Sequence, residues 1–205
     1  MKKKAITSTV LGLALACSAA NAQEGGAFVG LFGGVGLNTT HSAASVSNNA
    51  GSSSGFSTET VFNLIYGAKL GYILAMNQNN AFRIYGDFTA GDFRSNDRSY
   101  YLMTAGGGID YLLSFSKFGI FLGAGYGYAF GQFINALEDA RPHQVYANVG
   151  FAWNISKLQL ELGAKIPFFK YAEQNMTLNA GGTNISGTFY VRTTAQIYFG
   201  ANVVF

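Results

Sequence analysis

Apolar and polar residues alternate along most of this chain with the period of a β-strand. The clearest case is residues 188–205, where one parity is apolar from Phe189 to Phe205 and the other carries Arg192, Gln196 and Asn202. A soluble strand averages about 5–6 residues, whereas a tilted strand that crosses a bilayer needs about 9–11. The pattern therefore predicts a strand that stands between lipid and a polar interior.

Seven earlier segments repeat this alternation: residues 27–37, 60–73, 81–90, 100–112, 118–130, 143–154 and 158–168. Longer connections follow the odd-numbered segments and tight turns follow the even-numbered ones. This arrangement predicts an all-β fold, an eight-stranded transmembrane antiparallel up-and-down β-barrel with periplasmic turns and extracellular loops. Both termini would then lie in the periplasm. The first long connection, rich in Ser, Asn, Gly and Ala, is expected to be a flexible loop.

The uncharged stretch 118–137 is long enough to be read as a transmembrane helix by hydropathy. Its glycines fall mostly on one face only if the stretch is extended, which favours a strand whose small inner residues leave room for bulky neighbours. Outward aromatic residues are predicted to form two girdles. One comprises Tyr72, Phe82, Tyr111, Phe118, Trp153 and Phe205, and the other Phe62, Phe88, Tyr101, Phe130, Phe168 and Phe189.

Every charged residue placed well inside a predicted strand falls on the polar parity. These residues are Lys69, Arg83, Asp87, Asp110, Glu161, Lys165 and Arg192. A Lys or Arg facing lipid at mid-depth costs about 2–4 kcal/mol, which is enough to enforce such a pattern. Eight strands enclose an interior that side chains only just fill, so we expect these charges to pair as a structural plug. An ion-conducting pathway is the alternative.

The N-terminus has the organisation of a cleaved signal peptide over residues 1–22. Three lysines precede a short apolar stretch, and Ala20-Asn21-Ala22 matches a signal-peptidase site. Residues 23–205 would form the barrel. Removing the three lysines lowers the 13 basic residues to 10, equal to the 10 acidic residues, so no nucleic-acid partner is indicated. Cys17 would leave with the peptide, unless it is a lipoprotein cysteine.

The sequence offers little catalytic or metal-binding chemistry. His41 and His143 are the only histidines, and neither has the spacing of a metal site. No catalytic residue, metal ligand or cofactor site is predicted. A lipid-modifying enzyme with a Ser/His/acid triad is a weaker alternative. Glu138 and Asp139 could hold a divalent cation or lipopolysaccharide, although a solvated acidic loop is the preferred interpretation.

Three stretches of the second half resemble the Helicobacter outer membrane protein family. They are Gly107 to Leu112 with Phe121 to Gly125, Asn148 to Phe151, and Leu160-Glu161-Leu162-Gly163-Ala164-Lys165-Ile166-Pro167, followed by the closing strand. The resemblance implies a surface-exposed outer-membrane barrel in a family with adhesin and porin members. The chain lacks the large extracellular domain and the loop cysteine pairs of the adhesins.

The C-terminal alternation of Phe199, Ala201, Val203 and Phe205 resembles the signal by which the barrel-assembly machinery selects its clients. Together these features predict a non-enzymatic integral outer-membrane protein with a structural or surface-interaction role through its first and fourth loops. A small-solute porin is the alternative. The expected partners are outer-membrane lipid, lipopolysaccharide and the assembly machinery, while a host or envelope partner is not specified by the sequence.

Overall fold

The computed structural model describes residues 25–48, 51–95, 98–180 and 183–205, so the predicted signal peptide lies outside the described residues. Nine strands and one helical turn are present in this part of the chain. They are β1 (Gly26–Asn48), β2 (Gly51–Ala75), β3 (Asn80–Ser95), β4 (Arg98–Phe115), β5 (Phe118–Phe130), α2 (Gln132–Asn135), β6 (His143–Ile155), β7 (Leu158–Pro167), β8 (Ala172–Ala180) and β9 (Thr183–Val204).

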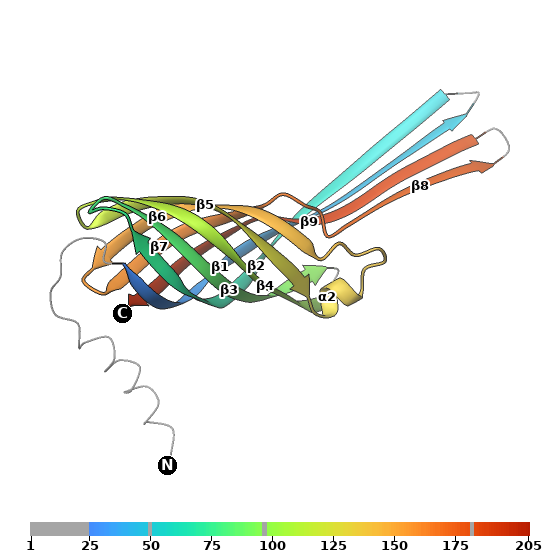
Figure 1. Cartoon of the computed structure of the whole chain (residues 1–205). Helices are drawn as coiled ribbons and strands as arrows, with labels where there is room; N and C mark the ends of the chain where they lie inside the picture. The colour runs from blue at the N-terminus through green and yellow to red at the C-terminus, as the bar shows by residue number, and fades with distance from the viewer. Residues whose placement is uncertain (1–24, 49–50, 96–97, 181–182) are drawn as a thin grey trace, which may run out of the picture.

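Eight of the strands close into a ring (Figure 1). Strands β1 to β7 pair with their sequence neighbours, β7 pairs with β9, and β9 closes the ring against β1. All of these pairs are antiparallel, so the predicted eight-stranded up-and-down barrel is confirmed. The remaining strand, β8, lies outside the ring and pairs with β9. Closure removes the open edges that a sheet would otherwise expose to lipid.

The two faces of the barrel differ sharply in polarity. Outward side chains such as Leu31, Leu64 and Leu122 are 65%, 74% and 63% exposed, whereas inward Lys69 is buried. An apolar exterior around a polar interior is what a bilayer-spanning barrel presents. Among the described residues, no helix is long and apolar enough to cross a membrane.

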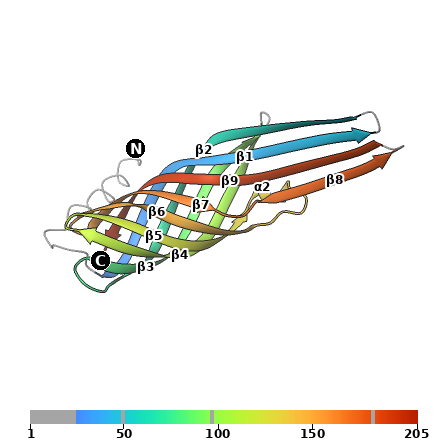
Figure 2. The same cartoon turned by 90° about the horizontal axis from the view of Figure 1, so that it is seen from above.

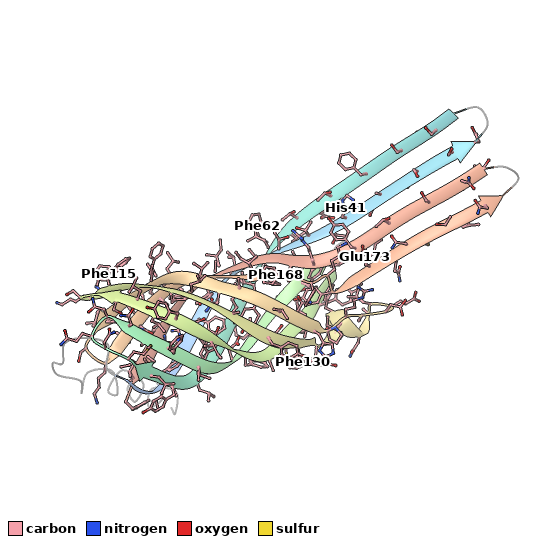
Figure 3. The ribbon with its side chains drawn as sticks, turned by 45° about the horizontal axis from the view of Figure 1, so that its top comes forward. His41, Phe62, Phe115, Phe130, Phe168 and Glu173 are labelled. Carbon is pink, nitrogen blue, oxygen red and sulfur yellow. The ribbon has the colours of Figure 1, made fainter. Side chains whose placement is uncertain are left out.

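The two ends of the barrel are built differently. At the turn end, β4 joins β5 and β6 joins β7 through two-residue turns, in which Ser116 (φ 60°) and Ser156 (φ 55°) have the positive φ of primed hairpin turns. The other end, called the loop end here, carries the connection with α2 between β5 and β6, and several strands extend beyond the ring there. The stretch 118–137 is a strand followed by the single turn α2. Figure 3 places the exposed Phe115 at the turn end, and Phe62, Phe130 and Phe168 toward the loop end.

The expectation that the first long connection is a flexible loop is wrong, because its described residues are strand. The described residues of the second predicted connection, 91–95 and 98–99, and most of those of the fourth are strand as well. Residues 38–48, 51–61, 172–180 and 183–193 extend the strands into a four-stranded sheet in the order β2-β1-β9-β8. Figure 2 shows these strands side by side, projecting beyond the ring. This sheet is called the blade below. Side-chain hydrogen bonds such as Ser45–Ser186 (2.7 Å) reinforce the backbone ladder across its strands.

Candidate functional site: a closed lumen and a projecting blade

Six of the seven predicted lumen charges meet inside the barrel. Lys69 Nζ donates to Glu161 Oε2 at 2.5 Å across the lumen, and Arg83 pairs with both Glu161 and Asp110. A second bridge joins Lys165 on β7 to Asp87 on β3. Three cations thus balance three carboxylates among fully or almost fully buried side chains. The bridges tie β7 to β2 and β3 on the opposite wall.

Neutral side chains complete the hydrogen bonding of the carboxylates. Asn148 Nδ2 donates to Asp110 Oδ1 at 3.0 Å, and Asn148 Oδ1 accepts from the Tyr198 hydroxyl at 3.0 Å. Asn202 donates to Glu161 at 2.7 Å. Because a buried charge is tolerated only when its remaining hydrogen-bonding positions are satisfied, these neutral groups are as much part of the network as the ions.

Aromatic rings surround the network, and the polar parity predicted only some of them. The Arg83 guanidinium lies 5.0 Å from the Phe121 ring centroid, and Lys69 Nζ lies 4.5 Å from that of Tyr198. Glycines on the inner face make room for them, as predicted. A Cβ added to Gly163 would come within 2.4 Å of the Tyr198 ring. The sequence signal for these residues was their position on the inner parity, but Phe121 is apolar and so was not recognised as a network residue.

Arg192 does not join this network, and its predicted place in the lumen is wrong. The β1–β9 register shifts between Leu37, which faces Ala195, and Asn38, which faces Thr193. Thr194 is therefore an extra residue in β9, a β-bulge that reverses the parity of everything before it. Thr193 points inward and donates to Asn38 Oδ1 at 2.7 Å, while Arg192 turns to the outer face. Within the described residues it forms no ion pair.

The loop end of the lumen is closed by an apolar cap. The short helix α2 places Phe133 and Ile134 into the mouth, where the Phe133 ring stacks on Phe93 with centroids 3.9 Å apart. Tyr171 meets Phe133 edge-on at 5.9 Å. Between this cap and the ion network lies a polar cavity of only about 10 Å³, beside Asn38 and lined by other side chains of the barrel interior. Such a space holds about one water molecule.

The blade has two faces of different chemistry. The face that continues the barrel interior is called the mouth face. It exposes the apolar side chains Val46, Met176, Leu178, Ile185 and Phe189. Phe189 was predicted for the outer aromatic girdle, and the bulge moves it to this face. The other face continues the lipid-facing exterior and is called the outer face. On it the His41 ring stacks with Tyr190 at 4.8 Å and Phe56 at 6.4 Å.

No protein-family model matches the chain. No curated protein matches it either. Solved structures similar to it include Neisserial surface protein A, at 15% identity over 83% of this chain and 97% of that one, with a TM-score of 0.42. OprG from Pseudomonas aeruginosa is 12% identical over 90% and 99% (TM-score 0.41), and Ail of Yersinia pestis 11% identical over 82% and 99% (TM-score 0.32). None of these similarities assigns a family or a role.

The predicted assembly residues lie at the turn end of β9. Phe199 and Phe205 project outward with 57% and 62% exposure, and Ala201 and Val203 are half-buried. The Phe205 amide donates to the Ala27 carbonyl at 2.9 Å, so the C-terminal residue is tied to the first strand. No cluster of His, Cys, Asp and Glu suited to a metal occurs in the described part of the chain.

Proposed function

We propose that the protein is an integral outer-membrane barrel with a closed lumen, and that the blade is an extracellular surface for binding a partner. The apolar mouth face of the blade carries this proposal. Exposed Met176, Leu178 and Ile185 lie beyond the ring, on the side that continues the lumen rather than the lipid-facing exterior. A contiguous apolar patch that lipid does not cover is a common mark of a protein-binding surface.

The two ends of the barrel support this position in the membrane. Short turns at one end and long connections at the other are typical of outer-membrane barrels, whose turns face the periplasm. The predicted signal peptide agrees with export, and the resemblance of the second half to the Helicobacter outer membrane protein family agrees with a small, surface-exposed member of it. In this orientation the blade stands outside the cell.

The filled lumen argues against the small-solute porin. Ion pairs, aromatic rings and the α2 cap occupy the cross-section of the described barrel, and a cavity beside Asn38 holds about one water molecule. We expect no stable conductance steps when the purified protein is inserted into a planar bilayer. Reproducible steps on the nanosiemens scale would contradict the closed lumen without bearing on the blade.

Neighbouring cross-strand pairs of the blade provide a matched test of binding. Leu178 faces Ile185 on the mouth face, and the adjacent pair Thr177 and Ser186 points to the outer face. The barrel in nanodiscs would be titrated onto cultured host cells and isolated envelope fractions. We expect saturable binding to one of them that Leu178→Asn/Ile185→Asn abolishes and Thr177→Asn/Ser186→Asn retains, with equal heat-modifiability on gels. The proposal would be refuted if the barrel bound neither the host cells nor the envelope fractions, or if the two variants bound equally well.

A further inference from the structure

A cleft on the outside of the barrel is separate from both the lumen and the mouth face. It has a volume of about 620 Å³ and lies where the connection before β6 meets the one after β7. Two backbone hydrogen bonds clamp these connections: Arg141 N–H donates to the Tyr171 carbonyl at 2.6 Å, and Phe168 N–H donates to the Val145 carbonyl at 2.9 Å. These hydrogen bonds hold the backbone on both sides of the cleft in a fixed position. Figure 3 labels Phe168 and Glu173 at the foot of the blade.

The cleft is apolar on the side of the lipid-facing surface. Phe168 and Phe169 line it and are 60% and 51% exposed. Below them the outward side chains of Ile166 and Val145, also exposed, continue the apolar exterior of β7 and β6. This side of the cleft offers an acyl chain a surface that is continuous with the one lipid already covers.

The cleft also carries positive charge. Arg141, His143 and Lys170 line it, and Glu173 is its one acidic residue. Lys170 Nζ donates to Glu173 at 2.6 Å, and this contact lowers the pKa of the Glu173 carboxyl below its usual value. Arg141 and Lys170 together exceed Glu173 by one positive charge. Cations next to an apolar surface match an anionic headgroup next to acyl chains, because phosphate oxygens form strong charge-assisted hydrogen bonds with Arg and Lys.

An aromatic ladder leads from the cleft along the outer face of the blade. Lys170 Nζ lies 4.3 Å from the Tyr190 ring centroid. The Tyr190 ring stacks on the His41 ring, which in turn stacks on the Phe56 ring. Hydroxyl groups flank the ladder, among them Thr58, which hydrogen-bonds His41 Nδ1 at 2.8 Å. Because His41 is stacked between Tyr190 and Phe56, this surface offers ring edges, the exposed Phe56 and the neighbouring hydroxyl groups. Such a mixture suits a saccharide, which has apolar C–H faces and a rim of hydrogen-bonding hydroxyls.

Resting on the proposed orientation in the outer membrane, we propose that this cleft binds a phosphorylated glycolipid of the outer leaflet, the chemistry of lipopolysaccharide. Its acyl chains pack on Phe168 and Phe169, a phosphate group lies between Arg141 and Lys170, and its sugars extend along the aromatic ladder. The bound lipid fixes the foot of the blade relative to the membrane surface. This site is distinct from the mouth face, which is left free for a protein partner.

Native mass spectrometry of the detergent-solubilised full barrel, titrated with bisphosphorylated lipid A, tests this proposal. We expect one tightly bound lipid, and Arg141→Gln/Lys170→Gln should weaken binding by about tenfold or more. The control Lys117→Gln/Lys157→Gln removes the same charge at the turn end and should leave binding unchanged. Glu173→Gln should strengthen it, because the variant removes a carboxylate that competes for Lys170.

Several results would overturn the proposal. Equal losses from the loop-end and turn-end variants, or phosphatidylglycerol binding as tightly as lipid A, would mean that anionic lipid binds without a site. Displacement of lipid A by millimolar inorganic phosphate would mean that the acyl chains contribute nothing. The Leu178→Asn/Ile185→Asn variant should bind lipid A like the native protein, so a failure of the blade as a protein-binding surface is separable from a failure of this site.

Discussion

Neutralising Glu161 is the sharpest perturbation of the lumen. Its carboxylate forms ion pairs with both Lys69 and Arg83, and it also accepts from Asn202 at 2.7 Å. The isosteric change Glu161→Gln keeps the volume and part of the hydrogen bonding. It removes one of three negative charges that balance three cations, so the buried network gains a net positive charge.

The expected cost follows from the burial of all three groups, which are at most 1% exposed. Removing one partner of a buried ion pair typically destabilises a protein by about 3–5 kcal/mol, because the remaining charge is left uncompensated. With a urea dependence of about 2 kcal/mol per M, this corresponds to a midpoint shift of about 2 M. The double variant Lys69→Met/Glu161→Gln restores neutrality and should recover much of the loss, since contacting residues couple.

Urea unfolding in lipid vesicles, followed by the fluorescence of the single tryptophan Trp153, measures these shifts. Arg192→Gln is the control, because Arg192 lies outside the network and should change stability by no more than about 0.5 kcal/mol. An unchanged midpoint for Glu161→Gln would refute the ion network as a stabilising element. A double variant as unstable as the sum of its parts would refute the argument from charge balance.

Three further outcomes are expected. Gly163→Ala should destabilise the barrel, because its Cβ would lie 2.4 Å from the Tyr198 ring; the fall in urea midpoint that this change causes should be smaller in a Tyr198→Ala background than in the native one, and equal falls would contradict the steric argument. Deleting Phe205 should lower the yield of heat-modifiable barrel, and a normal yield would contradict its role in assembly. The Lys170–Glu173 contact should stabilise fully above pH 4.5, the ordinary carboxyl pKa, and fade as the pH falls through the lower folded pKa of Glu173. Carboxyl NMR should show that Lys170→Gln raises this midpoint, and identical midpoints would exclude the contact in solution.

Periodicity alone predicted the barrel because each strand in the ring has two environments of opposite polarity. A residue such as Lys69 on the inner parity and Leu70 on the outer one can exchange places only at a cost of several kcal/mol. The six charges that meet in the lumen could be identified for the same reason. Their pairing across the barrel could not, because Lys69 contacts Glu161 on β7 rather than Asp87, its direct neighbour in the β2–β3 register.

The blade left almost no such signal. Apart from Phe56, residues 42–57 are small and mostly polar on both parities, so alternation cannot distinguish strand from loop there. Residues 42–48 pair with 51–57 in a hairpin and also with β9, a contact distant in sequence in which Ser45 bonds Ser186. The parity error at Arg192 has a different origin. Alternation was carried unbroken through Thr194, although a single extra residue reverses every side chain beyond it.

That extra residue determines which chemistry each surface of the loop end receives. If β9 kept one parity throughout, Val191, Phe189 and Ile185 would continue the lipid-facing side of Ile197 and Phe199. Because Thr194 is inserted, Val191 instead packs in the apolar cap, and Ile185 joins the mouth face of the blade. The same reversal brings Tyr190 to the outer face, beneath Lys170 and beside His41. The bulge thus separates a surface suited to protein from one suited to a glycolipid within a single strand.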